Sequence, residues 1–302
     1  MAESFTVHFV ANYWRHILGI ILPLLILYVI RSFFTRKRDT PETNRSPSEL
    51  PEEHPLAEFR DAQPTDKDSD LPTAPLSPLH AEDTEQMPYV HVKHTEEEMI
   101  QRSQEFYKLM NNRRSVRMFS QQPVPIEVIR NIVHTAGTAP SGAHTEPWTF
   151  AVVQDAEIKS KIREIVEKEE YINYDRRMGD KWVQELQFVN TNYEKPYLDE
   201  APYLIVVLKK PFRIGPDGTK HVHYYYEIST AISTGILIAA IQNVGLVTVT
   251  TTPMNAGVAI RELLGRPEHE KVMLLLPVGY PAPDATVPSI KRKPLNDIMV
   301  LK

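Results

Sequence analysis

Residues 113–120 read Arg-Arg-Ser-Val-Arg-Met-Phe-Ser, which places three guanidinium groups within five positions. The stretch follows a helical pattern and precedes a loop that contains Pro123 and Pro125. Each arginine carries a permanent charge and a planar fork of donors, so the stretch suits the capture of phosphate and of electron-rich carbonyl groups. A solvated basic turn is the alternative, and the segments that decide between the two are 140–148, 170–195, 248–255 and 291–293.

Helical and strand-like patterns alternate around this stretch, from about residue 89 to residue 302. A capping box at residues 95–98 begins a helix in which Met99, Phe106 and Met110 share one face. Further helices are expected at 126–137, after Asp155, at 228–244 and at 256–264, and strands at 149–153, 203–208, 246–250 and 271–278. This alternation predicts a domain of the α+β class with layers of the α/β type.

The composition of the chain excludes several classes of function. The net charge of the 302 residues is −5, which gives no electrostatic footprint for nucleic acid. The chain contains no cysteine, so disulfides, thiolate–metal sites and thiol catalysis are excluded. The eleven histidines form no metal-binding signature. We therefore predict neither a nucleic-acid partner nor a metal site.

The first 34 residues are predicted to form a membrane anchor. Residues 17–30 are uncharged and apolar, and flanking residues extend the run from about 9 to 34, near the roughly 20 residues that a spanning helix needs. Basic residues are concentrated after the run, which by the positive-inside rule predicts a single-pass protein with its catalytic domain in the cytoplasm. A cleaved signal peptide is the alternative, but no small-residue cleavage site follows.

Residues 35–88 are predicted to be a disordered, acidic, proline-rich tether. The segment 39–87 contains thirteen acidic residues, three basic residues and eight prolines. Such a segment cannot bury enough apolar surface to offset the entropy lost on ordering. Asn44-Arg45-Ser46 matches the glycosylation acceptor pattern, which matters only on the luminal side of a membrane.

Two further segments suggest a binding site. Residues 139–148 read Ala-Pro-Ser-Gly-Ala-His-Thr-Glu-Pro-Trp, a loop whose small residues let backbone N–H groups approach a ligand closely, although an ordinary turn has the same composition. Residues from about 170 to 198 carry many aromatic and charged side chains with little periodicity. A segment of that length inside a domain is more often a lid than a plain connection.

Together, the stretches RRSVRMFS (113–120), APSGAHTEPW (139–148), TVTTTPMN (248–255) and KRKP (291–294) resemble the FMN-dependent nitroreductase superfamily. The similarity is strong to its deiodinase branch, whose members remove iodide from iodotyrosines, and extends from about residue 89 to the end. The anchor and the tether also resemble those of the vertebrate membrane-bound members. The resemblance implies a nitroreductase-like fold, with a central, mainly antiparallel sheet flanked by helices.

The resemblance further implies a domain-swapped homodimer that binds two FMN molecules at the subunit interface. The residues that would bind FMN are Arg113, Arg114, Ser115, Val116, Arg117, Ser141, Thr250, Thr251, Thr252 and Arg292. Thr252 would be the catalytic hydroxyl donor to the flavin N5, where it would favour one-electron steps. For the threonine triplet, β-branched residues that end a strand are the alternative.

The same resemblance implies a substrate-binding set composed of Ala143, Glu170, Tyr174 and Lys195. Glu170 and Tyr174 share a helical face because they are four residues apart. The zwitterion of a free amino acid needs an anion for its ammonium group, and a cation and a donor for its carboxylate. The Ala143 N–H would bind the substrate phenolate. The alternative is that Glu170 ends an exposed charged run.

The activity implied is reductive deiodination of mono- and diiodotyrosine, which salvages iodide for thyroid hormone synthesis. NADPH would be the ultimate donor, acting through a reductase whose identity stays open, and the protein would lie in the plasma membrane and in vesicles. Two alternatives stay open. One is a general nitro or quinone reductase of the same superfamily, and the other is a flavin protein that binds halotyrosines without turnover.

Overall fold

The computed structural model describes residues 73–74, 85–189 and 191–302. The predicted membrane anchor at 1–34 lies outside the described residues, as do Asn44 and almost all of the predicted tether at 35–88. No helix within the described ranges is both long and apolar enough to cross a membrane.

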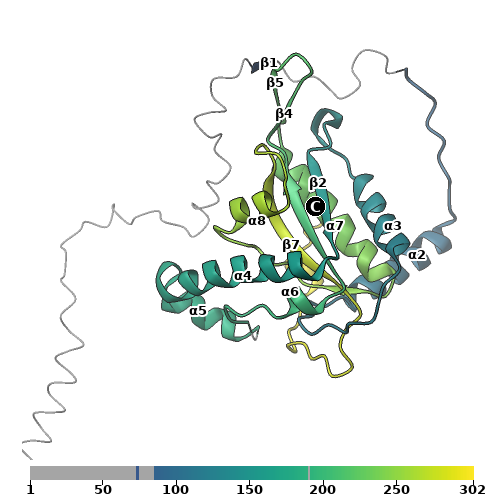
Figure 1. Ribbon diagram of the computed structural model, residues 1–302. Helices are drawn as coiled ribbons and strands as arrows, with labels where there is room; N and C mark the ends of the chain where they lie inside the picture. The colour runs from purple at the N-terminus through teal and green to yellow at the C-terminus, as the bar shows by residue number, and fades with distance from the viewer. Residues whose placement is uncertain (1–72, 75–84, 190) are drawn as a thin grey trace, which may run out of the picture. The chain divides into compact units, whose positions relative to one another are not determined.

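A four-stranded antiparallel sheet forms the centre of the domain (Figure 1). In spatial order its strands are β2 (Trp148–Val153), β3 (Tyr203–Lys209), β7 (Lys271–Gly279) and β6 (Val247–Thr248). Strand β6 is shorter than the predicted strand at 246–250. In its register Val249 lies opposite Pro277, which has no N–H for the ladder, and pairing resumes only at Thr251 and Leu275.

Helices cover both faces of the sheet (Figure 1). Side chains alternate along β3, so Tyr203, Ile205 and Val207 pack with α3 (Ile126–Gly137) and α7 (Tyr226–Asn243). The intervening residues pack with α4 (Ala156–Ile172), α6 (Tyr197–Glu200) and α8 (Gly257–Leu263). Every residue of β3 is buried, which explains its nearly continuous apolar sequence. The prediction of an α+β domain with a mainly antiparallel sheet is confirmed.

Helix α2 (Glu96–Asn111) begins with the predicted capping box, in which Glu98 N donates to Thr95 Oγ1 and Thr95 N donates to Glu98 Oε2. Its predicted apolar face is not covered by the described part of the chain, since Met99 and Phe106 are each 59% exposed. An amphipathic helix gains its stability mainly by packing its apolar face, and no described residue covers Met99 and Phe106.

A hairpin of β4 (Phe212–Ile214) and β5 (Lys220–Val222) is present where no strand was expected. In its turn, Asp217 Oδ1 accepts hydrogen bonds from Thr219 N at 3.0 Å and from Thr219 Oγ1 at 2.6 Å. The short strand β1 (Thr73–Ala74) pairs with β5. Short 3-10 turns lie at Gly142–His144 and Leu295–Asp297.

The predicted lid is more regular than its sequence indicates. Helix α4 continues into a π-helical turn at Asn173–Arg177, and α5 (Gly179–Gln187) follows. π-helical turns are rare and are frequently found at functional sites. The turn begins three residues after Glu170, one of the predicted substrate residues.

Replacement of Ile205 by Ala tests the importance of the buried strand. Ile205 is 0% exposed, so we expect the free energy of unfolding to fall by about 2–5 kcal/mol. The control Ile214→Ala, at a position that is 42% exposed, is expected to cost less than about 1 kcal/mol. Urea denaturation of the purified protein measures both, and equal losses would contradict this account of the core.

Candidate functional site

Four arginines, three of them from the stretch 113–120, line one cavity of about 210 Å³: Arg113, Arg114, Arg117 and Arg292. The stretch is attached to the edge of the sheet, where Val116 N donates to Thr248 O at 3.2 Å. The C-terminal segment closes the cavity from the other side. Its Arg292 donates through Nη1 to Asn111 O at 2.9 Å and through Nη2 to Arg113 O at 2.7 Å, and the Arg114 guanidinium donates to Pro288 O.

The charges in this cavity are not compensated. Burial lowers the pKa of Arg113, and the positive charges of Arg292 and Arg114 lower it further. Among the residues that the structure describes, none of the four arginines forms an ion pair with Asp or Glu. Guanidinium groups held together without counter-ions form a site for an anion, and their forked donors suit phosphate.

The predicted threonine triplet has two different faces. Thr251 is buried, and its Oγ1 lies 3.0 Å from Tyr197 Oη. Burial raises the pKa of Tyr197 to about 12, so this phenol stays protonated. Thr250 and Thr252 are exposed and lie on the opposite face because side chains alternate in extended backbone. Within the described residues their hydroxyls have no hydrogen-bond partner, so they are available to a ligand.

The structure brings Glu170, Tyr174 and Lys195 together. Lys195 Nζ lies 3.5 Å from Glu170 Oε2 and 5.5 Å from the centroid of the Tyr174 ring. Glu170 is 8% exposed and Lys195 is 4% exposed. The alternative that Glu170 ends an exposed charged run is therefore wrong. The sequence alone gives no sign that Trp182 of α5 packs edge-on against Tyr174, with 5.6 Å between ring centroids.

Burial shifts the pKa values of Lys195 and Tyr174. Burial lowers the pKa of Lys195, while the charge of Glu170 acts in the opposite direction. Burial also raises the pKa of Tyr174, and the charge of Glu170 adds to that effect. The positive charge of Arg117 acts to lower the pKa of both Tyr174 and Lys195. Arg117 therefore links the arginine cavity with the Glu170–Lys195 pair.

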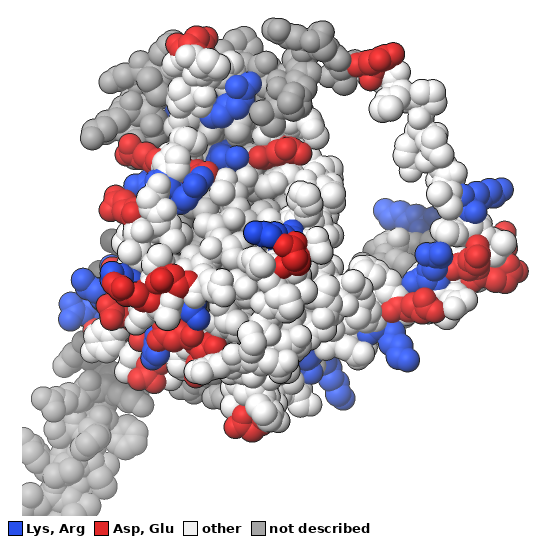
Figure 2. Space-filling view, turned by 45° about the vertical axis from the view of Figure 1, so that its right-hand side comes forward, with Lys and Arg blue, Asp and Glu red and all other residues white. Residues whose placement is uncertain are grey.

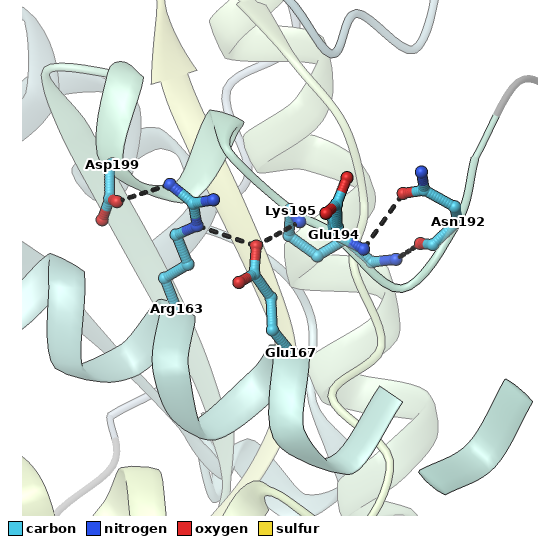
Figure 3. Close-up of polar contacts among 6 residues, drawn as sticks. All are labelled: Arg163, Glu167, Asn192, Glu194, Lys195 and Asp199. Atoms are coloured by element: carbon cyan, nitrogen blue, oxygen red, sulfur yellow. Dashed lines mark hydrogen bonds and ion pairs between the residues drawn. The ribbon is translucent and has the colours of Figure 1, made fainter. Parts of the chain in front are cut away.

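A polar network fixes the backbone at Lys195 against helix α4 (Figure 3). Glu167 Oε1 accepts from Lys195 N at 2.6 Å and from Arg163 Nε at 2.7 Å. Arg163 Nη1 also donates to Asp199 Oδ2 at 2.9 Å, and Lys195 Nζ donates to Asn192 O. The segment that carries Lys195 is thus attached to the helix that carries Glu170.

The loop 139–148 has a backbone conformation that side chains rarely adopt. Ala143, His144 and Glu146 have φ values of 49°, 51° and 44°. Ser141 Oγ accepts a hydrogen bond from Glu146 N at 3.0 Å, and no described group accepts the N–H of exposed Ala143. Strained loops of this kind concentrate at ligand sites, where the surrounding structure holds them in place.

This loop lies at the opposite end of the sheet from the arginine stretch. It leads into β2 at Trp148, which pairs with Lys209, and Lys209 pairs with Lys271 at the start of β7. The arginine stretch joins the sheet at Thr248, which pairs with Val278 near the end of β7. The two ends are about 20 Å apart at roughly 3.3 Å per residue. One copy of the chain therefore does not bring Ser141 and Ala143 to the arginine cavity.

A buried histidine connects the loop with the hairpin. His223 is 3% exposed, its N–H donates to Pro211 O at 2.8 Å, and its Nδ1 donates to Lys210 O at 2.9 Å. Its Nε2 has no hydrogen-bond partner among the described residues. The next residue, Tyr224, contacts the loop, because a Cβ at Gly142 would lie 3.1 Å from Tyr224 O.

Comparison with known proteins agrees with this fold. Residues 110–280 match the nitroreductase family, and the chain belongs to that family. Its relatives include an iodotyrosine deiodinase of Nematostella vectensis, 57% identical over 243 residues that cover 78% of this chain and 92% of the relative. Iodotyrosine deiodinase 1 of Homo sapiens is 59% identical over 219 residues, 72% of this chain and 76% of the relative.

A solved structure extends the comparison to three dimensions. The crystal structure of an oxidized iodotyrosine deiodinase bound to FMN and 3-iodo-L-tyrosine superposes with a TM-score of 0.55 at 29% identity. The similarity covers 63% of this chain and 96% of that protein.

The buried histidine predicts a loss of stability in mildly acidic solution. Burial lowers the pKa of His223 from its usual value of 6.5, the hydrogen bond to Lys210 O opposes this, and the charges of Lys210, Arg213 and His269 lower it further. As the pH falls below about 6.5, this histidine is therefore protonated in the unfolded chain before it is protonated in the folded chain. The free energy of unfolding then decreases as the pH decreases. His223→Asn keeps a donor for Lys210 O. Between pH 7.5 and 5.5 we expect the free energy of unfolding of this variant to fall by about 1 kcal/mol less than that of the unmodified protein.

Urea denaturation at several pH values measures this difference. His134→Asn, at an exposed position of α3, is the control and is expected to leave the pH profile unchanged. Identical profiles for His223→Asn and the unmodified protein would show that His223 does not titrate in this way.

Proposed function

We propose that the protein is an FMN-dependent oxidoreductase that removes iodide reductively from mono- and diiodotyrosine. The observation that carries this proposal is the buried group of Glu170, Lys195 and Tyr174 beside an uncompensated arginine cavity. The relatives in animals support it, because they are named iodotyrosine deiodinases. A solved relative with FMN and 3-iodo-L-tyrosine bound supports both the cofactor and the substrate.

The arginine cavity fits FMN. The phosphate of FMN is an anion that matches guanidinium groups without counter-ions, and the polar edge of the flavin ring is rich in carbonyl groups. Arg113, Arg114, Ser115 and Arg292 would hold the phosphate end, and Arg117 and the exposed hydroxyls of Thr250 and Thr252 would face the ring. Reduced FMN, when bound, supplies the two electrons of the reaction.

The buried ion pair fits the amino-acid part of the substrate. In the structure Glu170 and Lys195 compensate each other at 3.5 Å, which limits the cost of burying both charges. A zwitterion brings one charge of each sign, so its ammonium group can bind Glu170 while its carboxylate binds Lys195 and Tyr174. The buried charge therefore stays balanced when the zwitterion binds. A flat nitroaromatic compound has no ammonium and carboxylate groups to pair with Glu170 and Lys195.

The chemical step replaces the carbon–iodine bond of the ring by a carbon–hydrogen bond. One substrate molecule takes up two electrons and one proton and releases one iodide ion. The Ala143 N–H, which has no described partner, would hold the substrate phenolate. The hydroxyl of Thr252 would donate to the flavin, and closure of the segment from about 170 to 198 would exclude water.

We also propose that the site is completed by a second copy of the chain. The loop with Ser141 and Ala143 lies far from the arginine cavity of its own chain, so a partner copy would have to supply it. Helix α7 offers a surface for this partner: Tyr225, Ile228 and Ile232 are exposed at helical spacing. Figure 2, in which the side of Figure 1 that carries α2 and α3 comes forward, shows a broad area with few charged side chains.

In the N-terminal half of α7 the polar residues bond inward, so Ile228 and Ile232 face outward. Thr230 Oγ1 donates to Pro147 O at 3.0 Å, and Ser233 Oγ donates to Ala136 O at 2.7 Å. The exposed apolar residues of α2 and of the C-terminal segment 298–301 extend the surface available to a partner. Obligate dimer interfaces resemble a domain core cut in half, and this surface has that character.

The membrane anchor and the electron donor complete the proposal. The apolar run 17–30 and the basic residues after it support a single membrane span with the catalytic domain, residues 89–302, on the cytoplasmic side. An NADPH-dependent reductase would deliver the electrons to the flavin.

Release of iodide tests the activity. The purified protein is reduced with dithionite and mixed with diiodotyrosine, while free iodide and flavin absorbance are recorded. We expect iodide release together with flavin reoxidation. We also expect Glu170→Gln to lower kcat/KM about ten- to hundredfold while FMN stays bound, because a hydrogen bond to a charged group contributes about 1.5–3 kcal/mol.

Glu157→Gln is the matched control, since Glu157 pairs with Lys161 on the exposed side of α4. A flavoprotein that binds diiodotyrosine but releases no iodide would be a binding protein rather than a deiodinase. A protein that ignores diiodotyrosine and reduces nitroaromatic compounds would be a general reductase.

Introduction of charged residues on helix α7 tests whether a second copy of the chain binds there. We expect the double substitution Ile228→Asp and Ile232→Asp to convert the protein from dimer to monomer and to weaken FMN retention at least tenfold, because each site loses its partner loop. Sedimentation and flavin absorbance after gel filtration measure the two effects. Ile214→Asp, on the hairpin, is the control, and an unaltered dimer in the double variant would refute this interface.

A further inference from the structure

Asn173 is a buried polar residue with no part in the activity described above. It is 1% exposed and begins the π-helical turn that follows Glu170. Its Nδ2 donates to Glu170 Oε1 at 3.2 Å. Its Oδ1 accepts from Arg177 Nη1 at 3.0 Å and from Asn255 Nδ2 at 3.4 Å. The amide is thus fixed from both ends, which gives it one orientation.

The carboxylate of Glu170 is held through both of its oxygens. Oε1 accepts from Asn173, and Oε2 faces Lys195. A carboxylate held by a single partner can rotate about its last bond, whereas two partners on different oxygens fix its plane. Asn173 therefore determines the direction in which Glu170 presents its free lone pairs.

The same amide connects Glu170 with the threonine triplet. Asn255 ends the segment that begins at Thr250, and its φ of 62° turns the chain there. Met254 N donates to Thr252 O at 3.0 Å, which keeps this segment compact. A continuous chain of hydrogen bonds and one ion pair thus runs from Asn255 through Asn173 and Glu170 to Lys195.

The π-helical turn sets the direction of the residues that follow Asn173. A π turn inserts one extra residue, so side chains after it change their direction relative to the helix before it. Met178 N donates to Asn173 O at 3.0 Å across the turn. Arg177, which also pairs with Glu169 at 2.9 Å, holds the turn from outside. Asn173 itself faces Glu170 because the two residues are three apart at the end of α4, and Arg177 within the turn reaches Asn173 Oδ1.

We infer that Asn173 is a positioning residue for substrate selection: it orients Glu170 toward the ammonium group of the amino-acid substrate and links it to the flavin-facing threonines. This inference rests on the proposed function. It requires that Asn173 contribute to binding only when the ligand has an ammonium group. A halogenated phenol without the amino-acid part is bound without this contribution.

Binding of two ligands by the oxidised FMN-loaded protein tests the inference. Dissociation constants for 3-iodotyrosine and for 2-iodophenol are measured by quenching of flavin fluorescence. We expect Asn173→Ala to weaken 3-iodotyrosine about tenfold and 2-iodophenol less than twofold. When Glu170 is already replaced by Gln, we expect the further change Asn173→Ala to alter 3-iodotyrosine binding less than twofold, because Asn173 acts through Glu170.

A second variant keeps the test decisive if Asn173→Ala folds poorly. Asn255→Gly removes only the side chain, and glycine adopts the φ of Asn255 without strain. We expect it to weaken 3-iodotyrosine about threefold and to leave 2-iodophenol unchanged. Asn131→Ala, at an exposed position of α3, is the matched control and is expected to change neither constant.

The outcomes separate this inference from the proposed function. Equal weakening of both ligands by Asn173→Ala and Asn255→Gly, or no weakening of either, overturns the positioning role while the deiodinase activity stands. Failure of the unmodified protein to bind 3-iodotyrosine at all overturns the proposed function, and the inference with it.

Discussion

Burial of strand β3 on both faces is the constraint on which the rest of the structure depends. One face packs with α3 and α7, and the other packs with α4, α6 and α8. Because a slip of one residue would exchange the two faces, the two layers fix the register of β3 with β2 and β7. That register places the arginine stretch at one end of the sheet and the loop 139–148 at the other. The geometry of the site is therefore a consequence of core packing.

The two polar regions of the site differ in burial and in whether their charges are compensated. Glu170 and Lys195 are almost fully buried, and each compensates the other. The arginines of the cavity are partly buried or exposed and are not compensated by described carboxylates. Burial lowers the pKa of Arg113, and the neighbouring positive charges lower it further. An isolated buried charge is costly, whereas a partly solvated cluster is tolerated until an anion binds. The first region thus suits a zwitterion and the second an anion, which supports the division of roles between substrate and cofactor.

Much of the fold could be predicted from the sequence because burial leaves a strong pattern. The continuous apolar run at 203–208 and the capping box at 95–98 both correspond to observed elements. The hairpin at 212–222 and the π-helical turn were missed, since short polar strands and one inserted residue leave little periodicity. The proximity of Glu170 and Lys195 was expected only from the resemblance to a family, and their roles stay predictions. The contact of Asn173 with Asn255 joins residues far apart in the chain, and no local pattern could indicate it.

The distribution of site residues over the sheet has a consequence for symmetry. If the arginine cavity and the loop 139–148 lie at opposite ends of one chain, a second copy related by a two-fold axis can bring its loop to the first cavity. The same rotation then brings the first loop to the second cavity, so two equal sites form together. The N-terminal half of α7, which buries its serines and threonines and exposes Ile228 and Ile232, has the character that such an arrangement requires. The buried side of this half belongs to the core of its own chain, and the exposed isoleucines would be available to the second copy that we propose.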